Sequence, residues 1–135
     1  MGDEHKFELQ AKAENLASFR KELGELLALS GLDEKKKHEV TLAVDEAMAN
    51  VIRHGYQDVC GPIEVFFTNY ADRVEVLIRD FGKCFDPTKI PAPELPPKKP
   101  GGLGVYFIRT VMDKVQYHVG HNQSNELLLT KYKAS

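Results

Sequence analysis

The stretch Glu46-Ala-Met-Ala-Asn50-Val-Ile-Arg-His54 lies inside a strongly periodic segment of the chain. Glu46, Asn50 and His54 follow one another at i,i+4 steps, which predicts a single polar stripe along one side of an α-helix. A carboxylate, an amide and an imidazole in one line suit proton transfer, Mg²⁺ ligation and contact with an anion. A solvated helix face is the alternative interpretation. The apolar residues recur at the spacing of the opposite, core-facing side: Val40, Val44, Ala47, Met48, Val51 and Ile52.

The segments around this helix predict an α+β fold. Apolar alternation and helical periodicity, with turn and capping residues between them, indicate the other elements. The first predicted elements are a strand at 7–10 and a helix whose apolar stripe covers 16–27 and which ends at Gly31. Asp33 is the predicted cap of the motif helix. After it come a hairpin of 63–68 and 74–78, a helix over 103–112, and a hairpin of 115–119 and 126–132 that turns at 121–124. Helices on one face of a mostly antiparallel mixed sheet make a two-layer α/β sandwich.

The bulk composition narrows the class of protein. A chain of 135 residues with 42% hydrophobic content has the length for one core, so we expect a single domain over 1–135. The net charge of −2 gives no basic excess for nucleic acid or an anionic membrane. Cys60 and Cys84 form neither a metal-type nor a redox-type pair, and the chain shows neither an apolar signal core nor a run of membrane-spanning length. We expect a soluble, cytoplasmic protein with a protein or small-molecule partner.

Two later segments carry residues typical of a ligand site. Gly101-Gly102-Leu103-Gly104 directly precedes a predicted helix, where backbone N–H groups at the positive end bind phosphates, although a flexible hinge is the alternative. Asp80-Phe81-Gly82 ends an apolar strand, and its carboxylate can accept from an exocyclic amine or merely cap a turn. The glycine pattern is neither a P-loop nor a Rossmann fingerprint.

The segment from 86 to 100 holds six of the seven prolines and the pair Lys98 and Lys99. So many prolines exclude a helix or a central strand, and a connection of this length in a compact domain is typical of a lid or binding loop. We therefore expect a nucleotide lid at about 86–101. The two lysines close over phosphates in one interpretation and are simply solvated in the other.

The combination and order of these segments resemble the three boxes of the GHKL ATPases, which have the Bergerat nucleotide-binding fold. The short chain and the wording Glu-Ala-x-x-Asn-x-x-x-His-Gly-Tyr are most similar to the stand-alone anti-sigma-factor serine kinases of the RsbW and SpoIIAB kind. The matching segments are Glu46 to Tyr56 for the N box, Asp80 to Pro87 for the G1 box, and Gly101 to Val105 for the G2 box.

The resemblance implies a role for each matching residue. By this resemblance, Glu46 is the catalytic base and Asn50 ligates Mg²⁺. Asp80 accepts a hydrogen bond from the adenine amine. The phosphates are contacted by Gly102, Gly104 and Val105. The remaining nucleotide-binding residues that it implies are Arg53, His54, Gly82, Phe85, Gly101, Leu103 and Asn125. For Arg53 and His54, contact with phosphate and exposure to solvent are both open.

Two departures from the family pattern matter. Cys84 stands where Asp-x-Gly-x-Gly has its second glycine, which reduces backbone freedom beside the phosphates. Ser124-Asn125 stands where many members have Gly-Thr.

The resemblance also implies cofactors and partners. ATP and Mg²⁺ are the cofactors, and the partners are a sigma factor or other regulatory target, a small antagonist with a phosphorylatable Ser or Thr, and a second copy in a homodimer. Direct contact with nucleic acid or membrane is not expected. Three hypotheses follow: a protein serine/threonine kinase in partner switching, a nucleotide-binding regulatory module without phosphotransfer, and a detached histidine-kinase catalytic domain.

Overall fold

A computed structural model describes residues 3–56, 61–82, 102–120 and 124–134, which form strands, helices and one π-helical turn. Their order matches the order predicted from the sequence. The elements are β1 (Asp3–Gln10), α1 (Ala13–Ala28), α2 (Glu34–Asn50), the π-turn η1 (Val51–Gly55), β2 (Pro62–Asn69), β3 (Arg73–Asp80), α3 (Gly102–Val111), β4 (Lys114–Val119) and β5 (Asn125–Tyr132).

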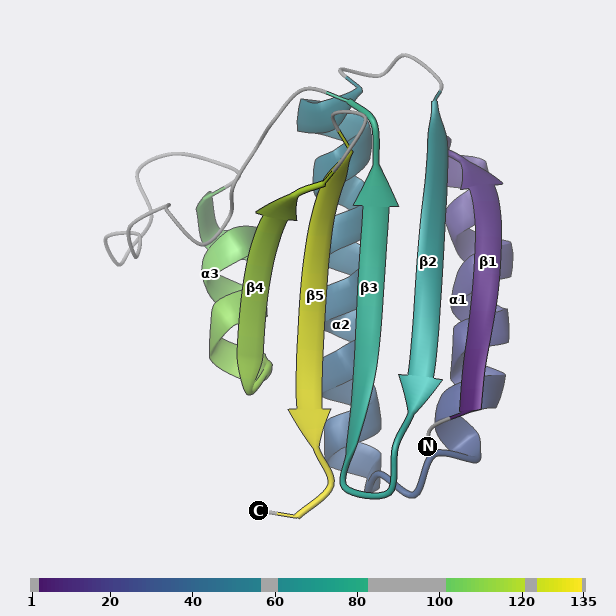
Figure 1. Cartoon of the computed structure of the whole chain (residues 1–135), viewed down its shortest axis with the longest axis vertical. Coiled ribbons are helices and arrows are strands. Elements are labelled where there is room, and N and C mark those ends of the chain that lie inside the picture. The colour runs from purple at the N-terminus through teal and green to yellow at the C-terminus, as the bar shows by residue number, and fades with distance from the viewer. Residues whose placement is uncertain (1–2, 57–60, 83–101, 121–123, 135) are drawn as a thin grey trace.

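The strands form one five-stranded sheet in the order β1-β2-β3-β5-β4, and each pairing among the described strands is antiparallel. The three helices lie behind this sheet on the same side, as Figure 1 shows, with α2 behind its centre. This arrangement confirms the predicted α+β sandwich of two layers. In the part of the chain that the structure describes, no helix is both long and apolar enough to cross a membrane.

The core lies between the sheet and the helices. Strand alternation turns one side of each strand toward the helices, and the register sets Val65 opposite Ile78 and Ile78 opposite Leu127. From the helices, Leu23 of α1 and Met48 of α2 are fully buried against this surface. The apolar side of α2 is therefore the core side, as its periodicity predicts.

A buried lysine joins α3 to the rest of the core. Lys131 of β5 points to the helical side, where its Nζ lies 3.0 Å from a carboxylate oxygen of Glu39 in α2. The same Nζ donates a hydrogen bond to the carbonyl of Val111, the last residue of α3. The pair satisfies a charge that burial would otherwise penalise, and it fixes the C-terminal end of α3.

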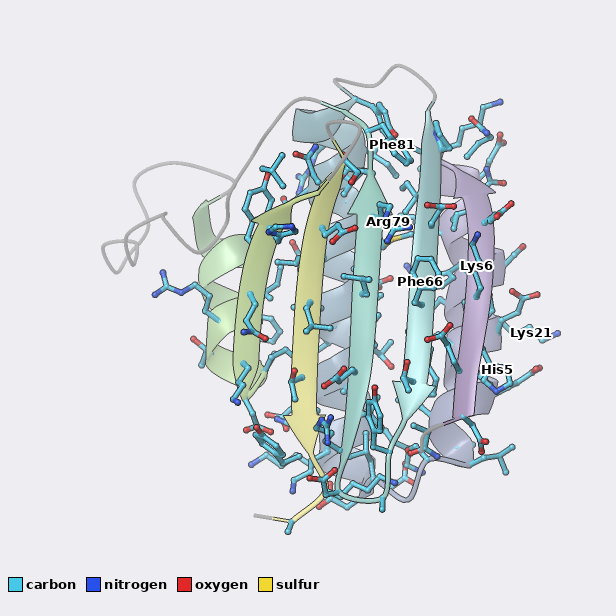
Figure 2. The ribbon with its side chains drawn as sticks, in the orientation of Figure 1. His5, Lys6, Lys21, Phe66, Arg79 and Phe81 are labelled. Carbon is cyan, nitrogen blue, oxygen red and sulfur yellow. The ribbon has the colours of Figure 1, made fainter. Side chains whose placement is uncertain are left out.

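Among the described elements, no helix lies over the other face of the sheet. Figure 2 shows Lys6, Phe66 and Arg79 on this uncovered side, toward the viewer. Charges pair across neighbouring strands, with Glu64 3.2 Å from both Lys6 and Arg79, and Arg79 2.8 Å from Glu126. Such cross-strand pairs suit a solvated sheet face.

The helix α2 begins and ends with distinct local geometry. Its N-cap is Asp33, whose side chain accepts a hydrogen bond of 2.8 Å from the backbone N–H of Lys36, so the predicted cap is confirmed. Its α-helical part ends at Asn50 and continues as the π-turn η1, closed by a 2.8 Å bond from the Tyr56 N–H to the Val51 carbonyl. The regular α-helical spacing behind the predicted i,i+4 stripe therefore ends at Asn50, because the π-turn has a wider backbone geometry. The side chain of His54 lies outside the described side chains, so its place on the stripe stays a prediction.

A comparison of one buried leucine with one exposed leucine tests this description of the core. Leu23 is 0% exposed and Leu29 is 82% exposed. We expect Leu23→Ala to lower the free energy of unfolding by about 2–5 kcal/mol, because it leaves a cavity. Leu29→Ala should change it by less than about 0.5 kcal/mol. Urea unfolding followed by circular dichroism measures both, and equal losses would contradict the arrangement of α1 against the sheet.

Candidate functional site

The polar residues of the predicted motifs lie at one end of the sandwich. Asp80 is the last residue of β3 and Asn125 is the first residue of β5, and the antiparallel register sets them opposite each other. Asn50 ends α2, whose C-terminal end lies behind the same, upper end of the sheet in Figure 1. Asp80 and Asn125, which are 45 positions apart in the chain, therefore meet through the strand register. The end of α2 lies behind the same end of the sheet.

Asp80 is a buried carboxylate whose orientation is fixed. It is 7% exposed, and its Oδ1 accepts a bond of 2.9 Å from the Gly82 N–H and one of 3.1 Å from the Asn125 amide. Burial raises the pKa of Asp80 above its ordinary value, and the bonds from Asn125 and Gly82 offset part of that rise. Both bonds go to Oδ1, so the geometry suits Oδ2 as the acceptor for a ligand amine.

Asn125 connects this carboxylate to two neighbouring segments. It is 4% exposed, and its Nδ2 also donates to the Gly82 carbonyl at 2.9 Å. Its Oδ1 accepts a bond of 2.9 Å from the Tyr117 hydroxyl of β4. These bonds give Asn125 a supporting role beside Asp80, and its predicted contact with the nucleotide stays a prediction. Tyr117 was not predicted, although strand alternation in β4 places it on the helix-facing side.

Asn50 and Glu46 form the helical part of the site. Asn50 is 6% exposed, so at this residue the polar stripe is not the solvated face of the alternative interpretation. Its Oδ1 accepts a bond of 3.4 Å from the guanidinium of the exposed Arg53. Glu46, one turn earlier, is half-buried. An amide oxygen, which can ligate Mg²⁺, and a cation, which can pair with phosphate, therefore lie together at the end of the motif helix.

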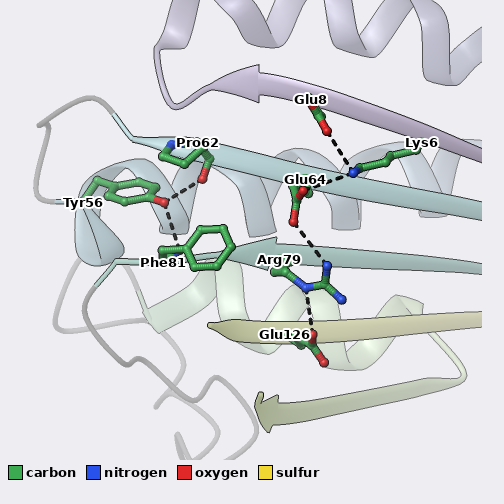
Figure 3. A network of polar contacts seen from close by, with 8 residues as sticks. All are labelled: Lys6, Glu8, Tyr56, Pro62, Glu64, Arg79, Phe81 and Glu126. Carbon is green, nitrogen blue, oxygen red and sulfur yellow. Dashed lines mark hydrogen bonds and ion pairs between the residues drawn. The ribbon is translucent and has the colours of Figure 1, made fainter. Parts of the chain in front are cut away.

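Tyr56 was not predicted as a site residue, although the ending Gly55-Tyr56 of the motif was the signal for it. Its hydroxyl donates to the Pro62 carbonyl at 2.6 Å and accepts from the Phe81 N–H at 2.9 Å. Figure 3 shows it between the start of β2 and the end of β3. It joins the end of the motif helix to the residue that follows Asp80.

The glycine-rich segment begins a helix, as predicted, because α3 starts at Gly102. A helix N-terminus presents unpaired N–H groups to a phosphate. Several predictions fall outside the described residues or side chains: Phe85, Cys84, Lys98, Lys99, Gly101, the side chains of His54, Leu103 and Val105, and the lid at about 86–101.

The residues present fit ATP and Mg²⁺ by their chemistry. Asp80 offers an acceptor to a base amine, and the start of α3 offers N–H donors to phosphates. Among the described residues no group of three His, Cys, Asp or Glu is placed to hold a metal. Asn50 would thus be a single protein ligand, which agrees with the way that Mg²⁺ binds through few protein oxygens together with phosphates and water.

Comparisons with known proteins identify the family. A family model described as the histidine kinase-like ATPase domain matches residues 9–131, and the chain belongs to this family. It is similar to the serine-protein kinase RsbW of Bacillus cereus strain AH187, with 30% identity over 92% of this chain and 81% of the relative. The protein of the same name from Bacillus thuringiensis subsp. konkukian strain 97-27 has the same identity and coverage. The resemblance to the RsbW group is therefore confirmed.

A solved structure supports the same fold. The chain is similar to the crystal structure of the RsbU and RsbW domains of a Mycobacterium tuberculosis protein, with a TM-score of 0.67 and 20% identity. The match covers 96% of this chain and 32% of the other, so the chain spans about a third of that longer protein.

The support that Asn125 gives to Asp80 is testable through a pKa. Asn125→Leu keeps the volume of the side chain but removes the amide donor, so the pKa of Asp80 should rise further. Asn15→Leu is the matched control, because Asn15 donates to the Gln10 carbonyl instead. Carboxyl carbon NMR titration measures both. An Asp80 pKa that stays the same in Asn125→Leu would refute the supporting role.

Proposed function

We propose that this protein is an ATP-dependent protein serine/threonine kinase that acts as an anti-sigma regulatory factor. The observation that carries the proposal is the buried Asp80 carboxylate, held through Oδ1 at the sandwich end where α2 also ends in Asn50. Family membership and relatives named serine-protein kinase support it. The proposed substrate is a small anti-sigma-factor antagonist with a phosphorylatable Ser or Thr, in a partner-switching system.

In the proposed reaction the protein supplies position and charge. Asp80 orients the adenine, the N–H groups at the start of α3 hold phosphate oxygens, and Glu46 accepts the proton of the partner's hydroxyl. Asn50 would hold Mg²⁺, which would supply neutralisation of the phosphate charge. Arg53 lies near enough to Asn50 to add positive charge at the same place.

The other nucleotide contacts remain part of the proposal. They are His54, Gly82, Phe85, Gly101, Gly102, Leu103, Gly104, Val105 and, behind Asp80, Asn125. A cytoplasmic location, a sigma factor or other regulatory target, and a homodimer complete the proposal, and light scattering measures the oligomeric state.

A nucleotide-binding regulatory module without phosphotransfer is the second candidate. It is favoured by Cys84, which replaces a glycine that the family often has beside the phosphates. Binding and transfer experiments separate the two candidates, because both require ATP binding and only the first requires transfer.

Asn50 is the test of the metal part of the site. Wild-type protein should bind ATP more tightly with Mg²⁺ than without it, and Asn50→Ala should lose roughly ten-fold or more of that gain. Asn15→Ala, at an exposed amide hydrogen-bonded to the Gln10 carbonyl, should keep it. Isothermal titration calorimetry with and without Mg²⁺ provides the measurement. An undiminished Mg²⁺ effect in Asn50→Ala would remove Asn50 as the ligand.

Glu46 is the test of the catalytic step. Glu46→Gln keeps the size of the side chain but removes the base, so phosphoryl transfer to the proposed antagonist substrate should fall roughly 10²–10⁴-fold while ATP binding persists. Glu25→Gln, on the exposed side of α1, is the control and should retain transfer. Transfer from radiolabelled ATP measures the rate. If wild-type protein binds ATP and the antagonist without transfer, the second candidate replaces the first.

A further inference from the structure

We infer that Tyr56 is a positioning residue, which holds the end of β3 so that Asp80 discriminates adenine from bases without an amine. This inference rests on the proposed nucleotide site and adds to it a residue that touches neither the base nor the phosphates. The hydroxyl bridges two strands, since it donates to Pro62 at the start of β2 and accepts from Phe81, directly after Asp80 (Figure 3).

The tyrosine is fixed at both of its ends. Its backbone N–H closes the π-turn on the Val51 carbonyl at 2.8 Å, so its position depends on the geometry that follows Asn50. Its ring lies directly over Gly61, where an added Cβ would stand 2.2 Å from a ring carbon. Such a contact is impossible for a side chain, so glycine at 61 is what lets the ring approach β2.

The proton arrangement of the hydroxyl is also defined. Burial raises the pKa of Tyr56 above its ordinary value, which keeps the proton that the hydroxyl donates to Pro62. The oxygen then serves as the acceptor for the Phe81 N–H. One hydroxyl thus satisfies a carbonyl and an N–H that lie where two neighbouring strands end.

The position of Asp80 depends on the backbone on both sides of it. Before it, β3 pairs with β2 and β5, and the register continues to Asp80 itself. After it, Phe81 is held by Tyr56, and Gly82 is held by Asp80 and Asn125. Without the hydroxyl, the residue after Asp80 loses its described partner, and the strand end gains freedom to move the carboxylate.

The consequence is a loss of selectivity, not a general loss of binding. Asp80 accepts from an exocyclic amine, whereas inosine triphosphate carries a carbonyl oxygen at that position and would face the carboxylate unfavourably. A displaced Asp80 discriminates less between the two bases. The phosphate and metal contacts of Asn50 lie on α2 and do not pass through the Tyr56 hydroxyl.

The experiment compares wild-type protein, Tyr56→Phe and Tyr132→Phe. Tyr132 lies at the opposite end of β5 from the site and serves as the matched control. Calorimetry gives the affinity for ATP and for inosine triphosphate, and amide hydrogen exchange of the free protein gives the protection of Phe81. Val76, fully buried in the middle of β3, is the internal reference for global opening.

We expect Tyr56→Phe to lower the ATP preference and the relative protection of Phe81 by roughly three- to ten-fold each. The Mg²⁺ effect on ATP affinity and the behaviour of Tyr132→Phe should match wild type. An equal loss of affinity for both nucleotides, or an unchanged preference, would overturn the positioning role.

Failure of the underlying function is visible separately. Wild-type protein that binds neither nucleotide, or binds both equally, refutes adenine reading by Asp80 before any variant is compared. In that case the selectivity role falls with it, and unchanged Phe81 exchange in Tyr56→Phe would also refute the structural contact.

Discussion

The burial of the Asp80 carboxylate at the end of β3 is the constraint on which the site depends. A carboxylate out of water needs hydrogen bonds, and the β3–β5 register supplies them by setting Asn125 opposite. Gly82, two residues after Asp80, takes part with both its N–H and its carbonyl. The orientation of the Asp80 side chain therefore depends both on the pairing of β3 with β5 and on the backbone of Gly82.

The motif helix α2 also ends at this end of the sandwich, where it continues as a π-turn. An unbroken α-helix would keep its regular spacing of residues beyond Asn50. The π-turn that follows Asn50 interrupts this spacing before Tyr56. The tyrosine can then lie over Gly61 and contact the ends of two strands. The irregular turn is thus explained by the contact that it makes possible.

Much of the fold was predictable from the sequence because local patterns encode it. Alternation in β2 and β3, the cap at Asp33 and the periodicity of α2 each report a local preference that the packed structure keeps. The π-turn was not predictable in this way, since a helical pattern of apolar residues does not distinguish i→i+4 from i→i+5 bonding over one turn.

For the candidate site, the sequence indicated which residues carry chemistry but not how they are supported. Asp80 and Asn50 stand out by residue type within motifs, and the structure finds both buried. Asn125 acts on Asp80 through the register of two strands that are far apart in the chain, which no local pattern contains. Tyr117 bonds to Asn125 from the neighbouring strand β4. The role of Asn125 in particular required the pairing of β3 with β5 to be known.

The placement of the two halves of the site on different elements has a consequence for selectivity and catalysis. Asp80 belongs to the sheet, whereas Glu46 and Asn50 belong to α2, so the proposed base contact and the proposed metal and phosphate contacts lie on separate parts of the sandwich. Tyr56 connects them through backbone groups of β2 and β3 and not through the reactive side chains. Such a connection transmits position without adding charge to the site. In the proposed site, base recognition is therefore adjustable at the strand ends independently of the residues of α2.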